Sequence, residues 1–152
     1  DLCLRAKKLN IDVKIINNTS ILNAIGIVGL ELYKFGRTVS IPFDENANSF
    51  YDFFKKNQSI DLHTLFLLDL SPKDDKFMTI NLAIERLLKL GLNQDQLCIG
   101  CAALGSEKRQ IKYAKAKELK DDKFTELPQC LIIPGKLHFV EDEVLEQWKN
   151  SS

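Results

Sequence analysis

The chain has 152 residues, a mass of 17.3 kDa and 21 basic against 21 acidic side chains, so its formal net charge is zero. This balance argues against a protein that wraps a nucleic-acid backbone and against a polybasic membrane anchor, because both need an excess of Lys and Arg. The longest uncharged apolar stretch, residues 97–105, is far shorter than the ~20 residues of a membrane span.

The first third of the chain predicts a strand, a helix and a second strand. Residues 11–16 form a β-rich run that ends at an Asn-Asn pair. Thr19 or Ser20 then caps a helix with apolar residues at near-helical spacing, which ends around Gly36. Residues 38–42 form the second strand. No apolar segment follows the first lysines, which predicts no signal peptide. A helical pattern already begins at Asp1, which indicates an internal start.

The middle of the chain predicts two helices around a buried strand. A turn-like stretch at 43–48 precedes a short amphipathic helix marked by three phenylalanines at 50–54. The mostly apolar run at 62–70 is typical of a strand buried on both faces of a parallel sheet. After a loop at 71–75, Thr79 caps a helix whose inward residues are Leu82, Ala83, Leu87 and Leu90.

Four further elements complete the pattern. They are a buried strand at 97–104, a Lys-rich helix from Ser106 to about Leu119, a strand at 130–133 and a final helix at 140–148. This strand–helix rhythm predicts an α/β fold. The polar zone between Pro42 and Asp61 predicts a domain boundary, with residues 1–43 ending a first α/β domain and residues 44–152 forming a second one.

Two of the four cysteines have metal-site spacing, but a structural interpretation is favoured. Cys98 and Cys101 are spaced as C-x-x-C without a second pair of ligands. On a strand, positions three apart point to opposite faces. We therefore expect buried, reduced thiols and no metal site. The chain also lacks a dinucleotide-binding glycine motif and a P-loop.

The other polar candidates leave their roles open. His63, at the entry of a buried strand, is interpreted as structural, and His138 as either structural or facing a cleft. Asp69 follows a strand, where it would either contact a ligand or form a turn. The acidic cluster at 141–143 is interpreted as a solvated helix start.

Five segments together resemble the diphthine synthase family in order and spacing. They are residues 18–26 (NTSILNAIG), 29–36 (GLELYKFG), 38–42 (TVSIP), 62–69 (LHTLFLLD) and 134–138 (PGKLH). The resemblance covers essentially the whole chain. It places Asp1 well inside a family member, so that roughly the N-terminal third to half, with its Gly-Asp-Pro-type loop, is expected to be absent.

The resemblance implies a tetrapyrrole-methylase-like methyltransferase fold, consisting here of the end of the N-terminal α/β domain plus the C-terminal α/β domain. It implies S-adenosyl-L-methionine as methyl donor, bound in the cleft between the two domains, S-adenosyl-L-homocysteine as product, and a homodimer. The implied substrate is the modified histidine, the diphthamide precursor, of translation elongation factor 2 in the cytoplasm. This fragment alone is expected to be inactive, and no residue is a clear catalytic base.

The resemblance also assigns cofactor contacts to five residues. Ser20 and Ile21 would touch the cofactor at a strand-to-helix turn, and Leu68 would lie against the adenine. Leu104 and Gln129 complete the set. Two positions depart from the family pattern: Ala103 replaces the usual Arg, and Gln129 replaces a common His, so it can form hydrogen bonds but cannot titrate.

Two other functions stay open. One is a methylase of the same fold class that acts on a tetrapyrrole or RNA, although the retained TVSIPF and LHTLFLLD segments speak against it. The other is a non-catalytic α/β interaction fragment.

Overall fold

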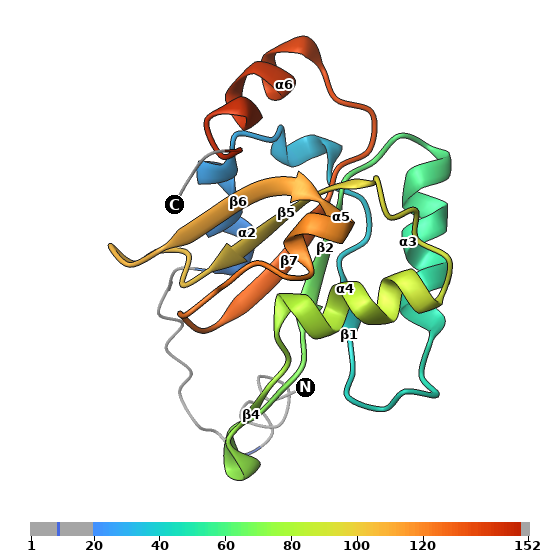
Figure 1. Cartoon of the computed structure of the whole chain (residues 1–152), viewed down its shortest axis with the longest axis vertical. Helices are drawn as coiled ribbons and strands as arrows, with labels where there is room; N and C mark the ends of the chain where they lie inside the picture. Colours follow the sequence, from blue (N-terminus) through green and yellow to red (C-terminus); the bar gives the residue numbers. More distant parts are fainter. Residues whose placement is uncertain (1–8, 10–19, 150–152) are drawn as a thin grey trace.

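The computed structural model describes Leu9 and residues 20–149. Among these residues the centre of the fold is a five-stranded mixed sheet with the order β1-β2-β7-β5-β6 (Figure 1). Its strands are β1 (Val39–Ile41), β2 (Thr64–Leu68), β5 (Leu97–Ala102), β6 (Gln110–Lys115) and β7 (Gln129–Ile133). The predicted strand at 11–16 and the cap at Thr19 lie outside the described residues.

The sheet is parallel at one edge and antiparallel elsewhere. β2 pairs in parallel with β1 but antiparallel with β7, and β5 pairs antiparallel with both of its neighbours. The prediction for residues 62–70 was right about the strand and its burial and wrong about a fully parallel sheet. Apolar runs such as this one indicate that both faces are covered, and they do not fix the direction of the neighbouring strand.

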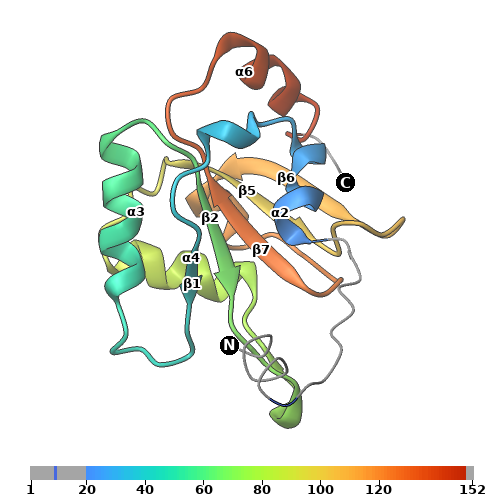
Figure 2. The ribbon, with the colours of Figure 1, turned by 180° about the vertical axis from the view of Figure 1, so that it is seen from behind.

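Helices cover both faces of the sheet, as the two opposite views show (Figures 1 and 2). One face carries α3 (Ser49–Ser59), α4 (Ile80–Lys89) and the short α5 (Ala116–Leu119). The other carries α2 (Ile21–Ala24), the 3-10 turns η1 (Ile25–Val28) and η2 (Leu32–Lys34), and α6 (Phe139–Glu146). A small hairpin, β3 (Leu70–Ser71) and β4 (Lys76–Phe77) around η3 (Pro72–Asp74), extends beyond the sheet.

The alternation of side chains along the strands divides the core into two layers. On β5, Cys98 packs in the layer under α3 and α4, whereas Ile99 and Cys101 pack in the layer under η1 and α6. On β7, Leu131 belongs to the first layer and Cys130 to the second. The prediction that Cys98 and Cys101 point to opposite faces as buried thiols is confirmed.

The helix predicted from Ser20 to Gly36 is interrupted. Ser20 caps α2, but Gly29 takes a left-handed backbone with φ of 98°, which ends η1. A Cβ at this glycine would overlap the side chain of Val144 on α6. The glycine therefore allows close packing at a break between two turns, where the sequence predicted the interior of one helix.

The Lys-rich helix predicted from Ser106 is wrong. Residues 110–115 form β6, and α5 follows for one turn only. Ile111 and Tyr113 are buried, while the intervening Lys112 is partly exposed. This period-two pattern suits an edge strand that faces a core on one side.

The predicted helix after Thr79 is confirmed, with one change to its buried face. The Thr79 hydroxyl accepts a hydrogen bond from the backbone N–H of Leu82 at 3.3 Å, and Gly91 with φ of 107° follows the helix end. Leu82 itself is 51% exposed, and Ile84 is buried instead. The remaining predicted elements lie within a few residues of β1, α3, β5, β7 and α6.

The boundary predicted at residues 43/44 stays a prediction. β1 precedes it and is nevertheless an edge strand of the sheet that the later strands form. Within residues 20–149, no helix is long and apolar enough to cross a membrane.

Candidate functional site

A mostly aliphatic pocket of about 240 Å³ opens where β2 and β5 end and β7 begins. We refer to it as the aliphatic pocket. Its lining residues are Ile21, Leu67, Leu68, Leu70, Leu104, Pro128, Gln129 and Cys130. Ligands of open α/β sheets bind beyond the carboxyl ends of strands, so its position is that of a binding site.

Four of the five residues that the resemblance assigns to the cofactor meet in this pocket. Ile21, Leu68 and Gln129 come from α2, β2 and β7, Leu104 comes from the turn after β5, and all four line the pocket. Ser20 directly precedes Ile21 as the N-cap of α2 and is exposed. Its hydroxyl oxygen accepts a hydrogen bond from the backbone N–H of Leu22 at 3.2 Å, which leaves the hydroxyl hydrogen able to donate.

A tight turn after β5 presents Leu104 to the pocket. Ala103 has a left-handed backbone with φ of 49°, and Gly105 has φ of 87°. The backbone N–H of Ala103 donates to the carbonyl of Pro128 at 2.9 Å, and Ser106 donates to the carbonyl of Ala103 at 3.1 Å. A non-glycine residue with positive φ is strained, and such strain persists where the surroundings impose it. Here the strained residue is Ala103, and the turn that it begins directs Leu104 to the pocket.

The amide of Gln129 is already engaged by the protein. Its Oε1 accepts from the backbone N–H of Ile80 at 2.9 Å, at the start of α4. Its Nε2 donates to the carbonyls of Glu126 at 3.1 Å and Phe124 at 3.4 Å. The side chain thus ties α4 to the 124–129 segment, and the hydrogen-bonding capacity that sequence reasoning reserved for a ligand is used within the fold.

Two thiols lie side by side at the wall of the pocket. Cys130 lines it and is paired in register with Cys101 across the β5–β7 ladder. The hydrogen bond with Cys130 and burial raise the pKa of the Cys101 thiol well above its usual value. This thiol is therefore neutral at physiological pH and belongs to the apolar core next to Cys130, which lines the pocket. No cluster suited to a metal ion occurs among the described residues.

Asp69 forms a turn. Its Oδ2 accepts from the backbone N–H of Phe43 at 3.1 Å and its Oδ1 from that of Leu70 at 3.0 Å. Both carboxylate oxygens thereby hold the chain at the end of β2, which supports the turn interpretation of this residue over the ligand contact.

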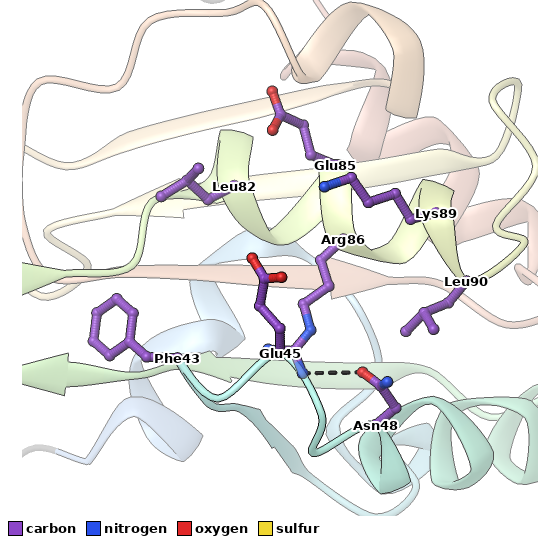
Figure 3. A pocket seen from close by; sticks show the side chains of 8 residues that line it. All are labelled: Phe43, Glu45, Asn48, Leu82, Glu85, Arg86, Lys89 and Leu90. Atoms are coloured by element: carbon purple, nitrogen blue, oxygen red, sulfur yellow. Dashed lines mark hydrogen bonds between the residues drawn. The ribbon is translucent and has the colours of Figure 1, made fainter.

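A second pocket, of about 250 Å³, lies between α4 and the 43–48 loop (Figure 3). Arg86 of α4 spans it and donates to the carbonyls of Pro42, Asp44 (2.7 Å) and Ala47 (2.9 Å), and to Oδ1 of Asn48 at 3.0 Å. These bonds occupy the terminal nitrogens of the guanidinium, so Arg86 fastens the loop to the helix. The other lining residues are Phe43, Glu45, Leu82, Glu85, Lys89 and Leu90.

Sequence reasoning missed a buried polar cluster on the other side of the fold. Glu141 is 1% exposed, in contrast to the solvated helix start that was expected. Its carboxylate accepts from the backbone N–H of Glu31 (2.9 Å) and His138 (2.8 Å), from Lys34 Nζ (2.5 Å) and from His63 Nε2 (2.9 Å). Glu141 is the third residue of α6 and accepts a hydrogen bond from the backbone N–H of His138, the residue before the helix. A glutamate at the third position of a predicted helix was therefore the one sequence pattern that could have pointed to this contact.

The geometry of this cluster fixes the tautomer of His63. The backbone N–H of Gly135 donates to Nδ1 at 2.9 Å, so Nε2 carries the hydrogen that faces Glu141. Burial lowers the pKa of His63, and the neighbouring Lys34 adds to this effect against the opposing influence of Glu141. His63 is fully buried, which confirms its structural interpretation. His138 is exposed at the start of α6 and stacks on Phe139.

Comparison with known proteins identifies a consistent set of relatives, although no family model matches the chain. The chain is 43% identical to the diphthine synthase of Methanocaldococcus jannaschii, covering 96% of this chain and 62% of the relative. It is 38% identical to the diphthine methyl ester synthase of Dictyostelium discoideum, covering 98% and 64% respectively. The chain therefore spans a little under two thirds of the length of these relatives.

The solved structures agree. A crystal structure from Entamoeba histolytica, assigned as a diphthine synthase, superposes with a TM-score of 0.92 at 37% identity and covers 99% of this chain and 65% of its own. The expected tetrapyrrole-methylase fold is thereby confirmed. The chain is homologous to the diphthine synthases over nearly its whole length and has their fold.

Proposed function

We propose that the protein is an S-adenosyl-L-methionine-dependent methyltransferase of diphthamide biosynthesis and that this chain supplies one wall of its cofactor site. The observation that supports the proposal most directly is the aliphatic pocket. It gathers Ile21, Leu68, Leu104 and Gln129, which are distant in sequence and which the resemblance assigns to one ligand.

The residues of the pocket fit the cofactor by their chemistry. Leu68 and Leu104 offer flat aliphatic surface to a purine ring, and burial of that surface favours binding. Ser20 holds a hydroxyl donor beside Ile21 at the start of α2, in a place suited to a polar end of the ligand. Gln129 acts indirectly, because its amide fixes the neighbouring backbone.

When bound, S-adenosyl-L-methionine supplies a methyl group activated by a sulfonium. For such a transfer the protein contributes alignment and exclusion of water more than proton chemistry. The aliphatic wall and the neutral thiol of Cys101 behind it serve that purpose. No residue in the described pocket is assigned as a base.

The acceptor follows from the same proposal. We assign it as the modified histidine of translation elongation factor 2, with the enzyme acting in the cytoplasm as a homodimer. The names of the relatives, diphthine synthase and diphthine methyl ester synthase, support this acceptor over a tetrapyrrole or RNA.

Filling the aliphatic pocket tests the proposal. In the protein at its full natural length, Leu104→Arg places a charged, longer side chain in the pocket and is expected to weaken S-adenosyl-L-homocysteine binding at least about tenfold in titration calorimetry. Ile60→Arg is the matched control, because Ile60 is 64% exposed after α3 and does not line the pocket.

Methyl incorporation into elongation factor 2 provides the second measurement. The wild-type protein is expected to transfer methyl groups to the modified histidine and to leave tetrapyrroles and RNA unlabelled. A wild-type protein that binds no S-adenosyl-L-homocysteine contradicts the methyltransferase proposal, and binding that Leu104→Arg leaves unchanged contradicts the assignment of this pocket.

A further inference from the structure

A third pocket, of about 370 Å³, is lined by segments that also contribute to the aliphatic pocket, and we call it the polar pocket after the charged and amide side chains in its mixed lining. Its lining includes Asn23 and Ile27 from α2 and η1, and Ser106, Glu107 and Arg109 from the loop after β5. The two pockets share both elements as walls, since Ile21 and Leu104 from the same segments line the aliphatic pocket. The same two segments therefore contribute residues to both pockets.

The charged groups of the polar pocket are available to a ligand. Among residues 20–149, the side chains of Asn23, Glu107 and Arg109 have no hydrogen-bond or ion-pair partner. Basic residues further along the chain behave differently: Lys112 pairs with Asp122 at 2.5 Å, and Lys117 pairs with Asp95 at 2.8 Å. Opposite charges therefore stand unpaired in one pocket.

The loop that carries these charges has a defined conformation. The left-handed Ala103 and Gly105 begin the turn. Ser106 Oγ accepts from the backbone N–H of Lys108 at 3.1 Å, and the Ser106 carbonyl accepts from that of Arg109 at 3.4 Å. The backbone at Arg109 is thus held in place, which reduces the entropy that the loop would lose on binding a ligand.

We propose that the polar pocket binds an α-amino-acid group, with Arg109 and Asn23 holding the carboxylate and Glu107 holding the ammonium. A guanidinium recognises a carboxylate through two parallel hydrogen bonds, and an acidic neighbour balances the positive end of a zwitterion. The inference rests on the proposed function, because the adjacent ligand is taken to be the methyl donor. The amino-acid group is either that of the cofactor or one carried by the methyl acceptor.

Three measurements on Arg109→Gln, in the protein at its full natural length, distinguish these sources. They are the affinities for S-adenosyl-L-homocysteine and for 5′-methylthioadenosine, which lacks the amino-acid end, and the KM of the acceptor at saturating cofactor. If the cofactor supplies the group, S-adenosyl-L-homocysteine affinity falls about ten- to a hundredfold and that of 5′-methylthioadenosine is unchanged. If the acceptor supplies it, its KM rises by a similar factor and both affinities stay constant.

Matched variants separate a specific site from surface charge. Lys108→Gln removes the same charge from the same loop, and Lys108 does not line the pocket. Arg109→Lys, which keeps the charge without the planar fork, is expected to restore part of the loss. Glu107→Gln is expected to weaken the same ligand as Arg109→Gln.

Two results would overturn the inference while leaving the proposed function intact. They are an Arg109→Gln variant in which all three quantities are unchanged, and a Lys108→Gln variant with the same losses as Arg109→Gln. A wild-type protein that binds no S-adenosyl-L-homocysteine contradicts the proposed function and the inference together.

Discussion

The carboxylate of Glu141 joins three parts of the fold, and its replacement by glutamine tests how that junction is held. Glu141 lies on α6, and its four donors come from the 31–34 segment, from His63 before β2 and from His138. Glutamine has nearly the same shape but only one acceptor oxygen, and its NH₂ group would face donors on the other side. The change therefore removes acceptors without opening a cavity.

The size of the effect can be obtained in two ways. Hydrogen bonds to a charged group contribute roughly 1.5–3 kcal/mol each, and breaking a buried charged pair costs about 3–5 kcal/mol. Burial alone would raise the pKa of Glu141, but the bonds from His138, Lys34, Glu31 and His63 outweigh it and hold the pKa at about 2, against an ordinary value of 4.5. That difference corresponds to about 3 kcal/mol. We expect Glu141→Gln to lower the free energy of unfolding by about 3–5 kcal/mol.

Urea unfolding measures this loss. Circular dichroism follows the whole chain, and the fluorescence of Trp148, the one tryptophan of the sequence, follows the contact between α6 and η1, where its Nε1 donates to the carbonyl of Val28 at 2.9 Å. Glu143→Gln is the control on the same helix, because Glu143 is exposed and its replacement should change stability by less than about 0.5 kcal/mol. A Glu141→Gln variant as stable as this control would refute the reasoning.

The same cluster predicts how stability depends on pH. The folded pKa of Glu141 is depressed, so its contribution is complete above pH 4.5 and is lost as pH falls toward about 2. Burial also lowers the pKa of His63, so the unfolded chain takes up that proton first and stability begins to decline below pH 6.5. In Glu141→Gln, the decrease in the free energy of unfolding between pH 4.5 and pH 2 is expected to be smaller than in the wild type. A wild-type protein that is equally stable at pH 7 and pH 3 would contradict the lowered pKa values of both Glu141 and His63.

Three further predictions concern buried groups. Asn57→Ala is expected to lower the free energy of urea unfolding by about 2–3 kcal/mol, because the Asn57 amide donates to Thr64 Oγ1 at 3.0 Å inside the fold; a change below about 0.5 kcal/mol would contradict this. Gln129→Leu removes the acceptor of the Ile80 backbone N–H and should speed hydrogen exchange at that amide. An unchanged exchange rate would contradict the hydrogen bond between Gln129 and Ile80. Thiol reagents should modify the described cysteines only after unfolding, and rapid reaction of the folded protein would show that the core opens; these cysteines are Cys98, Cys101 and Cys130.

Sequence patterns predicted the strands better than the helices, for a physical reason. β5 and β7 are continuous apolar runs, and the Pro-Gly pair at 134–135 follows β7, so composition and turn residues limit the choices. Residues 106–119 carry many lysines, which favour helices in isolation. The alternation of Ile111 and Tyr113 toward the core outweighed that propensity.

The helix predicted at 20–36 failed because of a contact with a distant segment. Its apolar spacing is compatible with a single helix, but α6 approaches closely at Gly29. Only a residue without a Cβ fits against Val144 at this point, and glycine can adopt the left-handed backbone there at little cost. The spacing of apolar residues in one segment contains no information about such an approach.

The aliphatic pocket could be anticipated from the sequence, whereas the polar cluster around Glu141 could not. Ile21, Leu68 and Leu104 were assigned to one ligand by resemblance. They lie at the start of a helix, at the end of a strand and in a turn, which are positions that the sequence marks. Glu141 lies in an acidic run whose composition indicates exposure, and its burial depends on Glu31, 110 positions away, and on His63, 78 positions away. A charged side chain can be buried where hydrogen-bond donors surround it. The local sequence shows that position 141 carries a charge, but it does not show that distant donors will meet there. The cluster around Glu141 therefore had to be found in the tertiary structure, whereas the pocket could be anticipated at the ends of the strands.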